Sequence, residues 1–284
     1  MLKKIDIPCV RSNFVFRNAH PALRNIILGY YWIKNPELLK NRKFIVTCEC
    51  SLFIHFFLDD IRFEVKIGEK SYNSKYSGMT GGQISGPAVA FSEDRLKSIS
   101  VAIFPVAFSQ MVGVSAHELK NHFVSITDVQ YRQFEPLIDI LRRQNCIEIQ
   151  KATLDSFFLQ RLPINEELLF FYRCLGPLYN SSGTVKVDEI RKGVYLSKRQ
   201  FERRFKECFG ATASTLRRQI RSSAALKGLL ENKDIFAVIE ELDYTDQSHL
   251  TKDLKWYTGH SPGSLLENFQ NKVLQFGPLQ FLVN

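Results

Sequence analysis

Apolar residues recur at helical spacing in the last third of the 284-residue chain. Residues three and four positions apart share one face of a helix, so this spacing predicts short helices with one buried side. The first set comprises Val187, Ile190, Val194, Phe201 and Phe205. Ser197 stands where a hydroxyl can cap a second helix, and Gly210 can end that helix in a left-handed conformation. The pattern over residues 185–210 therefore predicts two helices joined by a tight turn.

The same arrangement returns over residues 235–262. Its apolar positions are Ile235, Val238, Ile239, Leu242, Leu250 and Leu254, and Asp246 is the predicted cap. Between the two stretches, residues 216–230 carry a further helical stripe, formed by Leu216, Ile220, Ala224 or Ala225, and Leu229. We expect this segment to be one connecting helix that holds two helix-turn-helix units in a fixed relation.

A helix-turn-helix unit presents its second helix to the major groove of DNA. The second helices are expected at about 198–207 and 247–257, in adjacent groove turns roughly 34 Å apart. Outward-facing polar side chains on these helices can read base edges or hold phosphates. The predicted DNA-binding residues are Ser197, Lys198, Arg199, Glu202, Arg203 and Lys206 in the first unit, Arg217 and Arg218 in the connecting helix, and Gln247, Ser248, Thr251 and Lys252 in the second unit.

This region resembles the AraC/XylS family of bacterial transcription regulators over about eighty residues. The resemblance is carried by the run from Ser197 to Lys206, Gly210, Arg221 with Ala225 and Leu229, the run from Asp246 to Leu250, and the run from Gly259 to Pro262. It implies a seven-helix DNA-binding domain, here predicted at residues 183–284. Such a domain binds promoter DNA and recruits or blocks RNA polymerase.

The sequence departs from the family pattern inside both units. The family has a small alanine in each first helix and a glycine in each turn. Arg191 and Tyr195 stand at these positions in the first unit, and Ile239 and Asp243 in the second. Because tyrosine adopts positive φ poorly, we expect a rearranged first turn. Leu266 replaces the family's late arginine.

Charge is distributed unevenly between the units. The chain holds 38 basic and 29 acidic residues, a formal charge of +9. From Lys186 to Lys227 there are twelve Lys or Arg against four acids, or +8, whereas Gly228 to Asn284 holds four Lys against eight acids, or −4. Phosphate contacts are therefore expected on the first unit and the connecting helix. The alternative is that these charges form ordinary solvated helix faces.

The sequence of residues 1–125 predicts a β-rich, sensor-like domain. Continuous or alternating apolar runs at 45–58, 62–67 and 99–104 predict strands, and a helix is expected over 108–119 with a break at Gly113. Short, turn-punctuated strands predict a sandwich or open barrel, so the fold class of the whole chain is α+β. Three groups resemble a sensor-like domain often joined to this type of DNA-binding unit: Pro21, Leu23, Ile27, Tyr31 and Trp32; Val101, Ile103, Phe104 and Pro105; and Phe108, Met111, Gly113 and Val114.

Residues 126–182 predict helices that connect the two domains. Apolar stripes near Phe134, Phe158 and Tyr172 mark three of them. These helices either carry dimer contacts, as in the family, or pack onto the β-rich domain. A linker is expected at Gly176–Pro177 and 180–183.

Signals for catalysis, cofactors or membranes are weak. There is no phosphate-binding loop, nucleophile elbow, zinc-protease or dinucleotide motif, so we expect no enzyme, cofactor or metal. Cys48 and Cys50 share one face of an extended segment, where a buried thiol pair is favoured over a redox or metal pair. Scattered cysteines and the absence of a long apolar run or signal peptide predict a cytoplasmic, nucleoid-associated protein without membrane contact. For His55 and Trp32, core positions are favoured over a ligand-contacting role.

Three functional hypotheses follow. The first is a sequence-specific DNA-binding transcription regulator, controlled by an effector or partner at the N-terminal domain. Its partners would be double-stranded promoter DNA and, as candidates, RNA polymerase, a small-molecule effector and a second copy of the chain. The second is a ligand-binding β-domain protein whose degenerate helix-turn-helix units serve protein contacts. The third, a repair-type enzyme with the same DNA-reading module, is disfavoured because no nucleophile motif is present. Steeply salt-dependent duplex binding would separate the first from the second.

Overall fold

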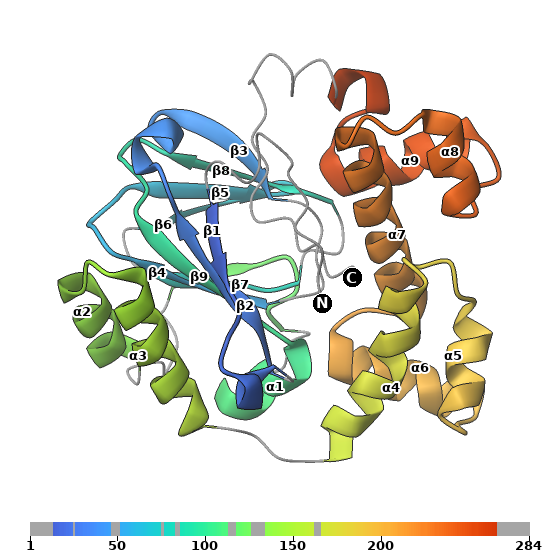
Figure 1. Ribbon diagram of the computed structural model, residues 1–284, viewed down its shortest axis with the longest axis horizontal. Coiled ribbons are helices and arrows are strands. Elements are labelled where there is room, and N and C mark those ends of the chain that lie inside the picture. Colours follow the sequence, from blue (N-terminus) through green and yellow to red (C-terminus); the bar gives the residue numbers. More distant parts are fainter. Residues whose placement is uncertain are drawn as a thin grey trace.

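A computed structural model describes residues 14–24, 26–46, 52–74, 77–82, 86–112, 118–125, 134–161 and 166–265 (Figure 1). The predictions for Cys48, Cys50, Gly113 and Leu266 lie outside these residues. The described chain has an antiparallel β region, here residues 14–125, followed by helices. This confirms the predicted α+β class. No described helix is long and apolar enough to cross a membrane.

Two antiparallel sheets form the β region, which is a sandwich as predicted. The larger sheet has the order β1 (Phe14–Arg17), β2 (Ile27–Ile33), β9 (Ser98–Ile103), β4 (Leu52–Phe57), β7 (Gly78–Thr80) and β10 (Phe123–Ser125). The smaller sheet has the order β3 (Arg42–Val46), β8 (Ala88–Ser92), β5 (Phe63–Ile67) and β6 (Lys70–Ser74). Two short 3-10 helices, η1 (Pro21–Leu23) and η2 (Pro36–Leu39), connect strands.

The apolar run at 45–58 is not one strand. Ile45 lies in β3 of the small sheet, whereas Leu52 begins β4 of the large sheet. Both strands bury apolar side chains, so each end of the run has the pattern of a strand in the sequence. The run at 99–104 is also more buried than an alternating strand, because β9 lies between the sandwich interior and the helices outside it.

Helices cover the outer face of the large sheet. They are α1 (Pro105–Val112), which begins before the predicted Phe108, α2 (Glu135–Arg143) and α3 (Ile147–Leu159). The Tyr30 hydroxyl donates to Asp155 Oδ1 at 2.9 Å, and Trp32 Nε1 donates to Gln150 Oε1 at 2.7 Å. These bonds join β2 to α3 and place Tyr30 and Trp32 in the core, as predicted. Helices α2 and α3 pack onto the β region, which is one of the two alternatives, and dimer contacts stay a prediction (Figure 1).

The remaining helices form what we call the helix-turn-helix region, residues 166–265. It contains α4 (Glu166–Asn180), α5 (Val187–Gly193), α6 (Lys198–Phe209), α7 (Ala213–Leu230), α8 (Ile235–Glu241) and α9 (Gln247–Thr258). These helices lie together on one side of the molecule (Figure 1).

The predicted linker is wrong at Gly176–Pro177, whereas residues 181–183 do form the turn that follows α4. Gly176 and Pro177 lie inside α4, which packs on α5, α6 and α7. After α4 the chain turns at once, and Gly183 N donates to Leu178 O at 2.8 Å. Gly183 has φ +79°, and a Cβ there would lie 2.6 Å from the Arg217 carbonyl oxygen. Glycine is therefore required by close packing here rather than by chain flexibility.

Candidate DNA-binding surface and ligand pocket

The first helix-turn-helix unit has the predicted apolar core. Ile190 of α5 and both Phe201 and Phe205 of α6 are buried in one cluster. The rings of Phe201 and Phe205 lie 5.4 Å apart, and Phe201 also meets Phe170 of α4 at 6.4 Å. The predicted stripes are confirmed, and they fix which side of α6 faces away from the protein.

Both ends of α6 are closed by the predicted residues. Ser197 Oγ accepts from Gln200 N at 3.3 Å, while Gln200 Oε1 accepts from Ser197 N at 3.1 Å. This reciprocal pair is a capping box, which the Ser-x-x-Gln spacing could have indicated. Gly210 ends the helix with φ +67°. The caps of α6 thus depend on local sequence alone.

The first turn is not rearranged, contrary to the prediction. Tyr195 has φ +54°, the same value as Asp243 in the second turn. The Tyr195 side chain is 92% exposed, so it avoids contact with the protein while its backbone follows the left-handed path. The turn survives because packing of the flanking helices dictates it, at a backbone cost of about 1–2 kcal/mol.

The predicted polar residues of α6 gather on one exposed face. All five are exposed; Lys198 lies at the start of the helix, and the other four point away from Phe201 and Phe205: Arg199, Glu202, Arg203 and Lys206. Arg203 makes only a loose surface contact, 3.7 Å from Nη1 to Glu207 Oε1. We call these five residues the α6 face.

The second unit repeats this geometry. Asp246 Oδ1 accepts from His249 N at 2.7 Å and caps α9, while Leu250 and Leu254 are buried. Gln247, Ser248 and Lys252 are exposed, and Thr251 is half-buried. The sequence prediction of this helix and its inward residues is confirmed.

A buried ion network holds α9 against α7. Asp253 Oδ1 accepts from Arg218 Nε at 2.7 Å, and its Oδ2 accepts from Arg221 Nη2 at 3.0 Å. The Arg221 guanidinium also lies 4.3 Å from the Tyr244 ring centroid, and that of Arg218 lies 4.1 Å from the Trp256 ring. The family resemblance marks Arg221 but gives no sign that Asp253 is its partner.

Three polar side chains of α7 and α9 have partners within the protein, among them the predicted DNA-binding residues Arg217 and Arg218. The third is His249, which is partly exposed and whose Nε2 lies 3.1 Å from Arg221 Nη2. Arg217 Nη2 donates to the Thr184 carbonyl at 3.1 Å, and burial, with the nearby Arg221 charge, lowers the pKa of Arg217. Arg218 is bound to Asp253. DNA binding by Arg217 and Arg218 stays a prediction.

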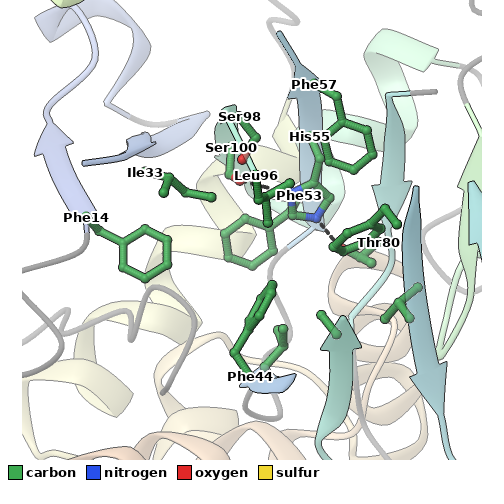
Figure 2. Close-up of a pocket in the computed structure, with 14 residues that line it drawn as sticks. Phe14, Ile33, Phe44, Phe53, His55, Phe57, Thr80, Leu96, Ser98 and Ser100 are labelled. Atoms are coloured by element: carbon green, nitrogen blue, oxygen red, sulfur yellow. Dashed lines mark hydrogen bonds between the residues drawn. The ribbon is translucent and has the colours of Figure 1, made fainter. Parts of the chain in front are cut away.

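A pocket lies between the two sheets of the β region (Figure 2). The empty space in and around it is about 640 Å³, which includes open solvent at its mouth. The lining residues are Phe14, Ile33, Phe44, Val46, Phe53, His55, Phe57, Phe63, Val65, Thr80, Ala90, Leu96, Ser98 and Ser100. Among these, the sequence alone suggests a pocket role only for His55, because lining side chains from eight strands are brought together by the fold.

His55 is the polar centre of the pocket. Its Nδ1 lies 2.9 Å from Ser100 Oγ, and its Nε2 lies 2.7 Å from Thr80 Oγ1 (Figure 2). The Phe53 ring stacks beside it at 5.8 Å. Burial lowers the pKa of His55 from 6.5 to about 4, so the imidazole is neutral at pH 7. The predicted hydrogen-bonded histidine is confirmed, and it also lines a cavity.

The β region touches both helix-turn-helix units. Helix α1 packs on α4 and α6. Ile45 of β3 belongs to the apolar core formed by α7, α8 and α9. Gly259, which ends α9 with φ +82°, is so close to Pro87 that a Cβ at Gly259 would meet its ring at 3.4 Å. No cluster of metal-ligating side chains occurs among the described residues.

Comparison with known proteins gives one family match. A family model described as a helix-turn-helix domain matches residues 192–268. No curated protein matches the chain.

Three similar solved structures are all of ToxT from Vibrio cholerae. One shares 11% identity with a TM-score of 0.46, covering 90% of this chain and 98% of that chain. ToxT bound to (E)-4-(8-methylnaphthalen-1-yl)but-3-enoic acid shares 13% identity with a TM-score of 0.45, covering 80% and 95%. ToxT bound to an unsaturated fatty acid shares 11% identity with a TM-score of 0.40, covering 79% and 93%. The two capped units agree with the family match at residues 192–268, so this part of the chain is a helix-turn-helix domain.

Proposed function

We propose that this protein binds specific promoter sequences through α6 and α9, placed in adjacent turns of the major groove. The observation that carries the proposal is the α6 face, where a capped helix with buried phenylalanines exposes four cations. Arginine side chains can pair with guanine edges in two hydrogen bonds, and lysines suit phosphates. Arg199 and Arg203 are therefore assigned to bases, and Lys198 and Lys206 to the backbone.

The connecting helix supports a two-groove arrangement. Helix α7 has 18 residues, so its length is about 27 Å at 1.5 Å per residue. Successive major-groove faces lie roughly 34 Å apart. The ion network at Asp253 fixes α9 to α7, so Gln247, Ser248, Thr251 and Lys252 would meet DNA at a set distance from the α6 face. Arg217 and Arg218 then act mainly by holding this arrangement.

We further infer that the β region is the sensor. Phe44 and Val46 of β3 line the pocket, whereas Ile45 between them enters the core of the second unit. Because successive side chains of a strand point to opposite faces, β3 contacts the pocket on one face and the core of α7–α9 on the other. A ligand that displaces Phe44 or Val46 would move Ile45. Such a ligand changes the DNA affinity of the protein if it binds more tightly to one position of Ile45 than to the other. We assign sensing to residues 1–125 and DNA binding to 183–284 preceded by α4, while dimerisation and RNA polymerase contact stay candidate properties.

The test begins with DNA captured from genomic fragments by the full-length protein and identified by sequencing. A shared motif with two parts one helical turn apart is expected. In mobility-shift titrations on that motif, Arg203→Ala should weaken binding by about 1–3 kcal/mol and relax preference at one base pair. Capture of random fragments, or unchanged affinity and preference for the variant, would overturn the assignment.

One observation favours a second function for the second unit. Phe236 of α8 is 68% exposed, and the surrounding segment carries a net negative charge. An exposed aromatic on an acidic unit suits protein contact better than contact with phosphate. If changing Gln247, Ser248 and Thr251 together to alanine leaves motif preference unchanged, this protein-contact function is the better account of unit two.

A further inference from the structure

We propose that the pocket binds a neutral amphipathic molecule, with an apolar body and a single hydroxyl or carbonyl that bonds to the His55–Thr80–Ser100 cluster. The proposal rests on the sensor role inferred above and names the chemistry of the ligand. It follows from three features of the pocket: the hydrogen-bonding state of His55, the absence of charge from its described wall, and the apolar surface around it.

The two hydroxyls beside His55 retain unused hydrogen-bonding capacity. A neutral imidazole has one N–H donor and one acceptor nitrogen. One hydroxyl of the Thr80 and Ser100 pair must therefore donate to the ring, and the other must accept from it. The accepting hydroxyl keeps its own proton free, and the donating one keeps oxygen lone pairs free. The cluster thus offers one donor and additional acceptors, which a hydroxyl or carbonyl group can satisfy.

The wall does not suit an anion. None of the fourteen described lining residues is Lys, Arg, Asp or Glu. His55 also cannot supply charge at pH 7, because burial lowers its pKa to about 4. An ionised carboxylate placed here would lose its water without gaining a cation, which is strongly unfavourable. A cationic ligand meets the same difficulty, because none of the described lining residues carries a carboxylate to pair with it.

The rest of the wall suits an apolar body. Aromatic and aliphatic side chains from both sheets surround the polar cluster, including Phe44, Phe63 and Val65 from the smaller sheet. Figure 2 shows Phe14 and Ile33 across the cavity from His55. A pocket with mainly apolar walls and a few convergent polar groups is the usual form of a small-molecule site.

The experiment compares decanol with decanoate, which share a chain and differ in the charge of the polar end. Binding to the full-length protein is measured by isothermal titration calorimetry near neutral pH. Decanol should bind at least about tenfold more tightly than decanoate, because the carboxylate alone is buried without a partner. Thr80→Val should weaken decanol binding by about fivefold to tenfold by removing one hydroxyl at constant shape.

Two controls separate hydrogen bonding from shape and stability. Thr80→Ser keeps the hydroxyl and should keep decanol affinity within about twofold. Ser98→Ala removes a neighbouring pocket hydroxyl that does not contact His55 and should have little effect. Decanoate binding as tightly as decanol, equal weakening in Thr80→Val and Thr80→Ser, or no binding of either molecule would each contradict the proposal.

Failure of this inference can be told apart from failure of the proposed function. The same protein samples are titrated with the captured DNA motif in the presence and absence of decanol. Decanol binding that follows the Thr80 pattern but leaves DNA affinity unchanged supports the ligand chemistry and contradicts sensing. Motif-specific DNA binding with no response of the pocket to either probe supports the regulator and contradicts the ligand chemistry.

Discussion

Both helix-turn-helix units have an apolar core, but only the second is also fastened to the connecting helix α7 by buried charged groups. In unit one, Phe201 and Phe205 pack beneath α6, and the cations of that helix are left exposed. At unit two, Arg218 and Arg221 of the connecting helix α7 turn toward the buried Asp253 of α9. Positive charge is therefore exposed to solvent on α6, whereas at the contact between α7 and α9 it is paired within the protein.

This difference shows that the number of cations in a segment is not the number that are free to contact DNA. The segment from Lys186 to Lys227 carries a formal +8, yet Arg217, Arg218 and Arg221 within it are engaged inside the protein. The cations left for phosphates lie mainly on the α6 face. A net charge read from the sequence thus overestimates the electrostatic contribution of the connecting helix and leaves that of α6 intact.

The largest expected effect comes from breaking the ion network. Asp253→Ala leaves the Arg221 guanidinium buried without its carboxylate, which costs about 3–5 kcal/mol of unfolding free energy. Glu207→Ala, which removes only the exposed 3.7 Å pair with Arg203 in unit one, should cost under about 1 kcal/mol. Urea denaturation measures both variants. Equal destabilisation of the two variants would mean that the ion network stabilises the protein no more than an exposed ion pair does.

The second effect concerns DNA affinity. Arg199→Ala should weaken binding to the captured motif by about 1–3 kcal/mol, because it removes an arginine of the α6 face that we propose contacts a base. Lys252→Ala on α9 should cost less, since acids of unit two offset its charge. Mobility-shift titrations at one salt concentration compare the two. A greater weakening by Lys252→Ala would assign the tighter contact to unit two.

The third effect is on salt dependence. The double change Lys198→Ala and Lys206→Ala should reduce the slope of log affinity against log salt by about 0.9 for each phosphate that is no longer neutralised. Both side chains are exposed, so folding should be unaffected. The pair Lys252→Ala and Lys255→Ala on α9 is the matched control and should flatten the slope less. The reverse order would make α9 the electrostatic anchor.

The smallest expected effect is on stability, and it compares the turn at Tyr195 with the turn at Asp243. Tyr195→Gly should stabilise the protein by about 1 kcal/mol, because glycine adopts φ +54° without the steric cost that tyrosine bears. Asp243→Gly, at the same φ in unit two, should gain less, because aspartate tolerates the left-handed region better. Thermal unfolding provides the measurement. A destabilised Tyr195→Gly protein would show that the exposed ring has a stabilising contact.

The sequence by itself determined the features that short-range physics controls. The caps Ser197 and Asp246, the helix end at Gly210 and the inward stripe of Phe201 and Phe205 were predicted and found. Each depends on residues within a few positions of one another, where helical periodicity and capping act. The outward direction of the α6 face follows directly from that stripe.

Tertiary structure decided everything that depends on distant partners. Asp253 meets Arg218 and Arg221 across more than thirty positions, and no local signal marks that pairing. The run at 45–58 divides between two sheets, and His55 meets Thr80 and Ser100 only because β4, β7 and β9 are neighbours. Pairing between segments is chosen by burial and hydrogen bonding in the folded chain, so the pocket and the inward arginines could be known only from the fold.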